Sequence, residues 1–586
     1  MRIRAIPWQP IIIGLVIREA VSFWTGHPYD FEIWVRLGHN VFQGVTPYGV
    51  YGPVEGLSFS PYESLPSIGY PPLWALLVEA IYGLYLILPL ESRFLYYFLL
   101  KQPIIFGDIA LGLVLYSFLA RRQHSRRASR VLWFWMLNPV VILVSAVWGM
   151  FDSLTMFTYL MLLLLGRTMS GGFLYVVGVF LKGVTVIYSP IVLGLRGYSK
   201  RDVIAVAILG ATASAATLLF LRGDLSGLLA AGASQLGGKG IGESMNLWYG
   251  WFFFRNILQV DTSPLTLVEN LFGILWIPGV IVSAYLALRR FKNQPWEERF
   301  VHSSLVVTLV FFLLRTAVNE QHLIYALSLM LLDNAVGNRG RWRLLTAMWV
   351  VGGLFLISNN TLLIRFLTPV LPSAFNLDLA INNAVPTGVL RYTLKLFLAL
   401  ASSAVTLQYL HHLWSDKEAR ETRAFTAMTR IFSGMRSADL VYLLFIWWGS
   451  AVLDFVVTGM ITDWDLVISR PYYLGIPIFG WYHIALVILV IFFNVILALH
   501  KHGDLRERLA ELFKFTGLSY IAAGLAQPAY TVLAAGQPFA ADQGYIFTGY
   551  LDIRVFVVSA IALGLIILWL RNLIPQKTES YASDIV

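Results

Sequence analysis

Apolar residues occur along this chain in long blocks, such as residues 11–23, 344–364 and 555–570, which short polar tracts separate. A helix needs about 20 apolar residues to cross the hydrocarbon layer of a bilayer. Strand-type alternation of apolar and polar residues is absent, and lipid offers no partners to unpaired backbone groups. The pattern therefore predicts an all-α fold, a polytopic transmembrane helix bundle.

The expected spans are approximately residues 9–25, 94–119, 131–148, 151–166, 202–222, 264–288, 300–316, 321–337, 344–364, 391–413, 437–460, 482–500, 514–535 and 553–572. Two more helices are expected to lie at the membrane surface. Residues 30–42 place their apolar side chains on one helical face, and residues 72–90 follow a Tyr-Pro-Pro turn and carry Glu79.

Lys and Arg cluster in the tracts between apolar blocks, whereas residues 26–70, 223–263 and 365–390 contain few of them. Because basic residues accumulate on the cytoplasmic side, the poor loops are expected outside and both termini inside. Residues 171–195 have an arginine at each end, so this segment is expected to enter the membrane and return, with Lys182 near its turn.

Composition narrows the class further. Only 13% of the 586 residues are charged and 58% are hydrophobic, whereas soluble domains are about a quarter charged. The net charge of +10 is explained by the topology tracts, so no nucleic-acid partner is expected. The absence of cysteine excludes disulfides and thiolate metal sites. A prokaryotic plasma membrane is favoured over the endoplasmic reticulum.

A charged cytoplasmic linker, residues 414–436, divides the chain. It separates a module of residues 1–413 from four expected helices in residues 437–586, whose role the sequence does not indicate.

Ionisable residues at membrane depth are costly and are functional candidates for that reason. Asp30 begins the first-loop helix, where it could instead serve as an N-cap. Lys101 and Asp108 are seven residues apart on one helical face and are expected to form an internal ion pair. Lys182 and the cluster from Arg315 to His322 could instead reach the interface by snorkelling.

Several short motifs follow one another in a suggestive order. They are Asp30-Phe31-Glu32, Pro47-Tyr48, Tyr70-Pro71-Pro72-Leu73, Asn138-Pro139, Phe151-Asp152, Lys182 with Tyr188 and Pro190, Asn246-Leu247-Trp248-Tyr249, and Glu320-Gln321-His322. With this order and on this side of the membrane, residues 1–413 resemble the GT-C glycosyltransferases that use polyprenyl-phosphate sugars. Within that superfamily they resemble the glucosyl- and mannosyltransferases of lipid-linked oligosaccharide and GPI assembly.

The resemblance implies inverting transfer of a hexose, mannose or glucose, from a polyprenyl- or dolichyl-phosphate sugar. The acceptor would be a hydroxyl of a lipid-linked glycan, a glycolipid or a protein at the extracytoplasmic face. Neither a metal nor another cofactor is implied, because the leaving group is a lipid phosphate monoester and not a nucleotide diphosphate.

The resemblance also implies roles for particular residues. Asp30 would be the general base with Glu32 as its substitute, because an acceptor hydroxyl must lose its proton as it attacks. The donor phosphate would lie near Lys182, Arg315, Glu320 and His322, since a leaving phosphate needs a cation beside it. The substrate-binding residues would be Tyr70, Asp152, Asn246, Trp248 and Tyr249.

Two other classes of function remain open. A transporter or lipid flippase could use the half-helix pair around Lys182, although no internal repeat supports this. A scaffold could use the first-loop helix to dock a partner. The oligosaccharyltransferase branch of the superfamily is disfavoured, because Trp447-Trp448 is followed by Gly449 rather than by aspartate.

Overall fold

The structure is a computed structural model of the chain. It describes residues 6–415, except 67, 90–91, 123–124, 196–199, 221–223, 225, 231–240, 258–272, 338–340 and 384, and residues 491–571, except 493, 497, 500–503 and 536–552. The chain divides into two compact units, residues 1–434 and 435–586, which are described separately.

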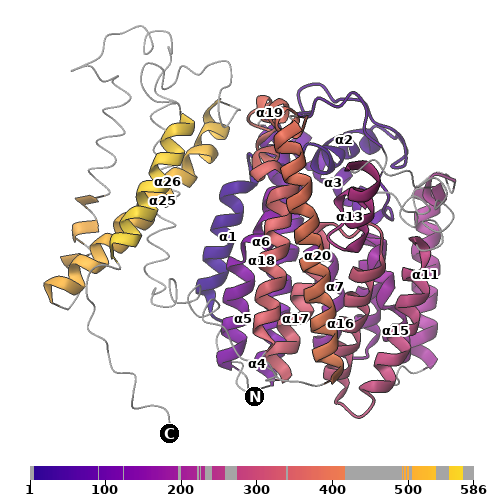
Figure 1. Cartoon of the computed structure of the whole chain (residues 1–586). Coiled ribbons are helices and arrows are strands. Elements are labelled where there is room, and N and C mark those ends of the chain that lie inside the picture. Colours follow the sequence, from indigo (N-terminus) through magenta and orange to yellow (C-terminus); the bar gives the residue numbers. More distant parts are fainter. Residues whose placement is uncertain are drawn as a thin grey trace, which may run out of the picture. The chain divides into compact units, whose positions relative to one another are not determined.

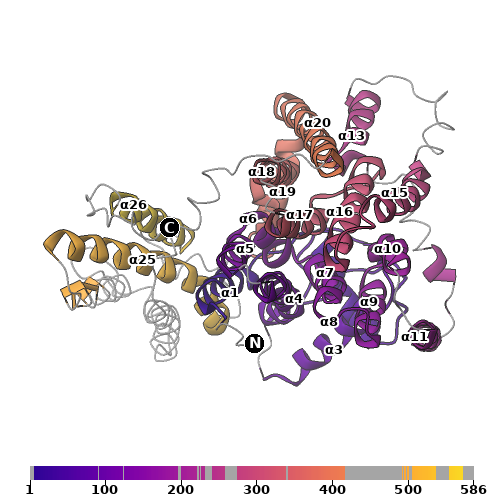
Figure 2. The same ribbon diagram turned by 90° about the horizontal axis from the view of Figure 1, so that it is seen from below.

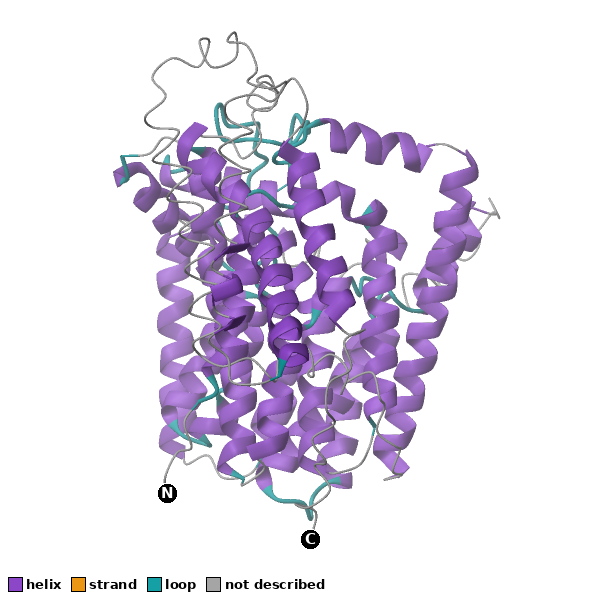
Figure 3. Cartoon of the chain, turned by 90° about the vertical axis from the view of Figure 1, so that its left-hand side faces the viewer, coloured by secondary structure: helices purple, strands orange, loops and turns teal. Residues whose placement is uncertain are grey.

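Helices make up the regular structure of both units, and the described residues contain no strand beyond an isolated bridge between Tyr51 and Leu65 (Figure 3). The all-α expectation is confirmed. The α-helices of the first unit are α1 (Trp8–Ser22), α2 (Asp30–Phe42), α3 (Leu73–Ile87), α4 (Arg93–Arg121), α5 (Ser125–Leu137), α6 (Pro139–Ile142), α7 (Asp152–Leu160), α8 (Leu162–Leu165), α9 (Met169–Leu181), α10 (Ser189–Gly194), α11 (Lys200–Phe220), α13 (Leu247–Phe252), α15 (Trp276–Arg290), α16 (Trp296–Leu314), α17 (Leu323–Gly337), α18 (Trp342–Asn359), α19 (Ser373–Asn383) and α20 (Val385–Ser415). Short 3₁₀- and π-helical segments join them: η1 (Leu143–Trp148), η2 (Gly183–Tyr188), η3 (Ile241–Glu243), η4 (Phe253–Ile257), η6 (Glu320–His322) and η7 (Thr361–Leu367).

Three helices of the described part are long and apolar enough to cross a membrane: α4, α18 and residues 390–415 of α20. A fourth exists if residues 127–137 and 139–148, which meet at 47°, count as one bent span. Asn138 causes the break, because its side chain caps α6 by accepting from the Val140 N–H at 2.9 Å. Pro139 has no N–H with which to continue α5.

Other expected spans are shorter than predicted. Helix α1 has 15 residues, and the helix expected over residues 151–166 is interrupted at Met161, which separates α7 from α8. Three to four helices of the described residues are therefore both long and apolar enough to span a membrane.

One end of the first unit carries the loops and short helices that concern function. Helices α2, α3, α13 and α19 lie together at the upper end in Figure 1, and the long helices beneath them are seen nearly end-on in Figure 2. Helix α2 begins at Asp30 and ends at Phe42, the bounds expected from its periodicity. It buries Phe31, Trp34 and Val35.

Residues 169–194 fold back on themselves with Lys182 at the turn. Helix α9 leads from the end of α8 to Lys182, which meets the first residue of α7, Asp152. The chain then returns beside α15 and α16, because the Tyr188 hydroxyl bonds to Thr308 at 2.8 Å and Gly194 packs against Leu288. The two halves have 13 and 12 residues, so the hairpin that the flanking arginines predict is present in the fold.

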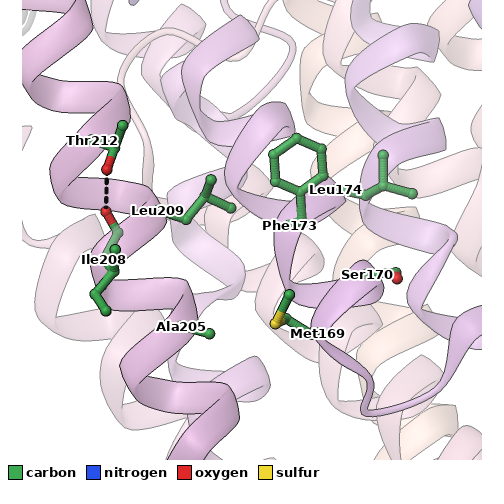
Figure 4. Close-up of a pocket in the computed structure, with 8 residues that line it drawn as sticks. All are labelled: Met169, Ser170, Phe173, Leu174, Ala205, Ile208, Leu209 and Thr212. Carbon is green, nitrogen blue, oxygen red and sulfur yellow. Dashed lines mark hydrogen bonds between the residues drawn. The ribbon is translucent and has the colours of Figure 1, made fainter.

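An open apolar cavity of about 530 Å³ lies between α9 and α11 (Figure 4). It is lined by Met169, Ser170, Phe173, Leu174, Ala205, Ile208, Leu209 and Thr212. Leu174 is eight residues before Lys182, or about 12 Å along a helix. The cavity therefore opens along the same helix that leads to Lys182, but does not include it.

The second unit contains α25 (Leu505–Ala535) and α26 (Ile553–Arg571). The two helices approach closely at glycines, since a Cβ on Gly517 would lie 2.8 Å from the Gly564 carbonyl oxygen. Small residues permit such close packing between helices in membranes. The expected helix over residues 437–460 lies outside the described residues, as does Trp447-Trp448-Gly449.

Candidate functional site

Asp30 is held at the start of α2 by a tryptophan from another segment. The Trp148 indole N–H donates to Asp30 Oδ2 at 2.9 Å. The N-cap position of α2 is Tyr29, which makes no side-chain capping bond, so Asp30 is the first helical residue and the N-cap interpretation is wrong. Its side chain is 29% exposed and can therefore be reached by a small group.

The surroundings of Asp30 favour its protonated form more than water does. Burial and the nearby Glu243 raise the pKa of Asp30 to about 6, against the Trp148 hydrogen bond and the charges of Lys182 and Arg365, which lower it. A carboxylate with this pKa is largely ionised at pH 7 and still basic enough to accept a proton.

His27 supports the same carboxylate without being charged. Its Nδ1 accepts from the backbone N–H of Asp30 at 3.2 Å and lies 3.3 Å from Oδ2. Burial and Arg365 hold the pKa of His27 well below its usual value, so the ring is neutral at pH 7. The contact between His27 and Asp30 is therefore not an ion pair.

Lys182 lies at the turn of the hairpin, close enough to Asp30 for each charge to act on the other. Its ammonium group donates to both carboxylate oxygens of Asp152, at 2.8 and 2.9 Å, and to Gln321 Oε1 at 3.2 Å. Lys182 is 1% exposed, so it does not snorkel to an interface. Asp152 is fully buried and fixes the lysine rather than meeting solvent.

Tyr70, Arg315 and His322 complete the group around Lys182. The Lys182 ammonium lies 5.0 Å from the centre of the Tyr70 ring, and Arg315 also acts on the Tyr70 hydroxyl. Burial, Arg315 and Lys182 lower the pKa of His322, which makes it a neutral hydrogen-bonding group at pH 7. The positive charge of this group therefore lies on Arg315 and on Lys182, which is paired with Asp152, and not on His322.

The Asn246-Leu247-Trp248-Tyr249 motif contacts the end of α16, which leads to Arg315. The Asn246 side chain donates to the Arg315 carbonyl at 2.8 Å, and the Trp248 indole donates to the Leu314 carbonyl at 2.9 Å. Tyr249 is fully buried, with Lys395 over its ring. These contacts hold the end of α16, where Arg315 begins the following loop.

Glu32 has a structural role. Its carboxylate accepts from Arg36 Nε at 2.7 Å and from the Phe59 backbone N–H at 3.1 Å, and both charged side chains are fully buried. Arg36 in turn donates to the Tyr51 and Tyr62 carbonyls. The pair fastens the first loop to α2, so the structure does not support Glu32 as a substitute base.

The charges that act on Glu320 include that of Lys395. Glu320 is fully buried and interacts with Lys395 and Asn359. Burial raises the pKa of Glu320 to about 7. Contact between Glu320 and the donor phosphate stays a prediction.

Lys101 and Asp108 are both buried, but they do not pair with each other. Asp108 accepts from Arg18 Nε at 2.7 Å, and the Lys101 ammonium donates to the Thr25 hydroxyl at 3.1 Å and the Val147 carbonyl at 3.3 Å. The expected internal ion pair is therefore wrong in its partners. Lys101 instead joins the segments that precede Asp30 and Trp148.

The sequence interpretation missed four residues at this site: His27, Trp148, Glu243 and Arg365. His27 is close to Asp30 in the sequence and could have been noticed. The other three come from segments far away in the chain, and no local signal marks them. Among the described residues, no group of three or more His, Asp and Glu could hold a metal ion.

The chain matches no protein-family model and no curated protein. The resemblance to GT-C enzymes therefore rests on the sequence motifs alone.

Proposed function

We propose that this protein transfers a hexose, mannose or glucose, from a polyprenyl-phosphate sugar to an acceptor hydroxyl. The observation that carries the proposal is Asp30, a partly exposed carboxylate whose pKa is about 6 and whose charge interacts with that of Lys182. The two residues are far apart in the chain, and the unit that contains them has helices long and apolar enough to span a membrane.

In the proposed reaction Asp30 acts on the acceptor, and Arg315 and Lys182 act on the leaving phosphate. Its carboxylate takes the proton of the acceptor hydroxyl while that oxygen forms a bond to C1 of the sugar. The bond from C1 to the phosphate oxygen breaks, and its electron pair leaves with the lipid phosphate. Arg315 and Lys182 stabilise the charge of this leaving group. A single displacement inverts the configuration at C1.

A donor phosphate would have to replace one of the present hydrogen-bond acceptors of the Lys182 ammonium. The three N–H groups of this ammonium already have acceptors in Asp152 and Gln321. A phosphate would therefore displace the neutral Gln321 side chain, whose bond to Lys182 is the longest of the three at 3.2 Å. Charge-assisted bonds to phosphate are stronger than bonds to a neutral amide, so this exchange is favourable.

The apolar cavity between α9 and α11 supports a lipid-bound donor. It lies along α9, the helix that ends at Lys182, and its lining of aliphatic and aromatic side chains suits a polyprenyl chain (Figure 4). The proposed orientation places Asp30 on the extracytoplasmic face and both termini in the cytoplasm, in a prokaryotic plasma membrane.

The test is Asp30→Asn in the purified full chain, supplied with dolichyl- or undecaprenyl-phosphate mannose or glucose and a panel of glycoside acceptors. Transfer should fall at least 100-fold, in line with the loss of a general base. The matched control is Glu55→Gln, which removes an exposed carboxylate from the same loop and should leave transfer unchanged. Wild-type rates in Asp30→Asn would refute the proposal, and a transporter would keep its activity after this change.

A separate experiment tests the expectation that hexose transfer needs no divalent metal ion. Transfer should persist in excess chelator, because Arg315 and Lys182 supply the positive charge for the leaving group. A loss that magnesium or manganese restores would contradict it.

A further inference from the structure

Asp30 borders a second set of side chains that the proposed donor site does not use. The charges that act on the Tyr70 hydroxyl are Lys182, Asp30, Asp152 and Arg315. Those that act on the Tyr62 hydroxyl are Arg365, Asp378, Glu243 and Asp30. Asp30 belongs to both sets, so it is near both the proposed phosphate side and a second group of side chains.

This second group is open and aromatic. Tyr29 and Tyr62 pack edge to face, with ring centres 5.9 Å apart, and each is 37% exposed. Glu243 is exposed, and the Arg365 side chain is 23% exposed. Tyr29 also interacts with Asp30 and Glu243. We call Tyr29, Tyr62, Glu243 and Arg365 the tyrosine patch.

Arg365 is fixed in place by a carboxylate and a strained turn. Asp378 accepts from Arg365 Nε at 3.0 Å and from Nη2 at 2.7 Å, and it also accepts from the Thr361 hydroxyl. Thr361, Leu362 and Leu363 have φ values of 44°, 54° and 68°. Residues other than glycine rarely adopt this left-handed backbone conformation, and residues held in it cluster at functional sites.

The strained turn is fastened to the segments that hold Asp30. The Phe366 carbonyl accepts from the Gly26 backbone N–H at 2.9 Å. The Phe366 ring lies 5.8 Å from both the His27 and the Trp148 rings. Main-chain and aromatic contacts thus fix the position of Arg365 relative to the Asp30 carboxylate.

The charges of the tyrosine patch favour an uncharged ligand. Asp378 pairs with Arg365, and Lys395, another cation that acts on Glu243, is buried. The carboxylates of Glu243 and of the neighbouring Asp30 are therefore the charges that a ligand of the patch would meet. Two carboxylates repel an anionic group, whereas they accept hydrogen bonds from hydroxyls. Tyrosine rings offer apolar faces and a hydroxyl at low conformational cost. These properties suit a sugar ring without a phosphate or carboxylate.

We propose that the tyrosine patch is the acceptor subsite, and that it selects an uncharged carbohydrate over a phosphorylated one. This inference rests on the proposed hexose transfer. It adds the residues that meet the acceptor and the charge class of the acceptor.

The first experiment compares two acceptors with the purified full chain and a saturating polyprenyl-phosphate hexose. The acceptors are octyl mannoside and octyl glucoside, each alone or with a phosphate on its 6-hydroxyl. The unphosphorylated acceptors should have a kcat/KM at least tenfold higher. Glu243→Gln should narrow this ratio, because it removes one of the two repelling charges. Equal use of both acceptor types, or no transfer to the unphosphorylated ones, would overturn the inference.

The second experiment measures Tyr62→Ala. Loss of one ring face should raise the acceptor KM about tenfold, which corresponds to about 1.4 kcal/mol, and leave the donor KM unchanged. The matched control is Tyr285→Ala on α15, an exposed tyrosine outside the patch, which should change neither constant. An unchanged acceptor KM, or a donor KM that rises equally, refutes the acceptor subsite while hexose transfer stands. Wild-type transfer in Asp30→Asn refutes the transfer itself, and the inference with it.

Discussion

The pKa of Asp30 can be moved by changing one hydrogen bond. The Trp148 indole N–H stabilises the ionised carboxylate, whereas burial and Glu243 destabilise it. Trp148→Phe keeps an aromatic ring beside His27 and Phe366 but removes the donor. The ionised form loses a stabilising bond, so the pKa should rise.

The size of the shift follows from the bond that is lost. A hydrogen bond to a charged acceptor contributes about 1.5 kcal/mol, and 1.36 kcal/mol corresponds to one pKa unit. The pKa should therefore move from about 6 to about 7. The ionised fraction at pH 6 then falls from about one half to about one tenth, and at pH 8.5 it changes little.

The assay is the pH dependence of kcat/KM for hexose transfer, which reports the groups of the free enzyme. A general base must be deprotonated, so activity should rise through a pH of about 6 in the wild type and stay level above it. In Trp148→Phe the same rise should occur about one unit higher, with about a fivefold loss at pH 6.

Two further variants test the assignment of this rise. Glu243→Gln should move it to lower pH, because a charge that raises the pKa of Asp30 is gone. The residual activity of Asp30→Asn should lack the rise. If the rise of kcat/KM occurs at the same pH in Trp148→Phe as in the wild type, or is still present in Asp30→Asn, Asp30 is not the titrating base.

Three substitutions test the supports of the fold, each by the thermal unfolding midpoint in detergent. Gly149→Ala should lower the free energy of unfolding by more than about 1 kcal/mol, and the midpoint with it, since φ is 94° and the new Cβ would lie 2.4 Å from an aromatic carbon of Phe31. Gly52→Ala, which has open space around it, is the control, and equal midpoints for the two variants would contradict the argument. Asp333→Asn leaves the buried Arg341 without its charge partner, which should cost about 3–5 kcal/mol, and a wild-type midpoint would show that the pair is dispensable. Lys101→Met removes the hydrogen-bond donor of the buried Thr25 hydroxyl and Val147 carbonyl oxygens, which should lower the free energy of unfolding by about 1–3 kcal/mol. An unchanged midpoint would disprove this.

Local features of this protein could be predicted because their causes are local. The periodicity of residues 30–42 is sufficient to define α2, and Asn138-Pro139 ends one helix and caps the next. The arginines that flank residues 171–195 indicated the hairpin at Lys182. Each signal lies within a few turns of the element that it determines.

The partners of the charged residues could not be predicted in the same way. Spacing along one helix placed Lys101 and Asp108 on one face, but Asp108 pairs with Arg18, which lies 90 residues earlier. Glu320 likewise interacts with Lys395, which lies 75 residues later. The energy of an ion pair depends on distance in space, which is decided by how the helices pack.

The sequence by itself determined a helical chain with membrane-length apolar helices and an acidic residue at the start of the first-loop helix. Tertiary structure decided which carboxylate can serve as a base. Glu32 and Asp30 are two residues apart on α2, yet Glu32 is enclosed by Arg36 and the first loop, whereas Asp30 stays partly open beneath Trp148. Only the packing of distant segments around each carboxylate makes this difference, because burial and charge partners set the pKa and the accessibility of an acid.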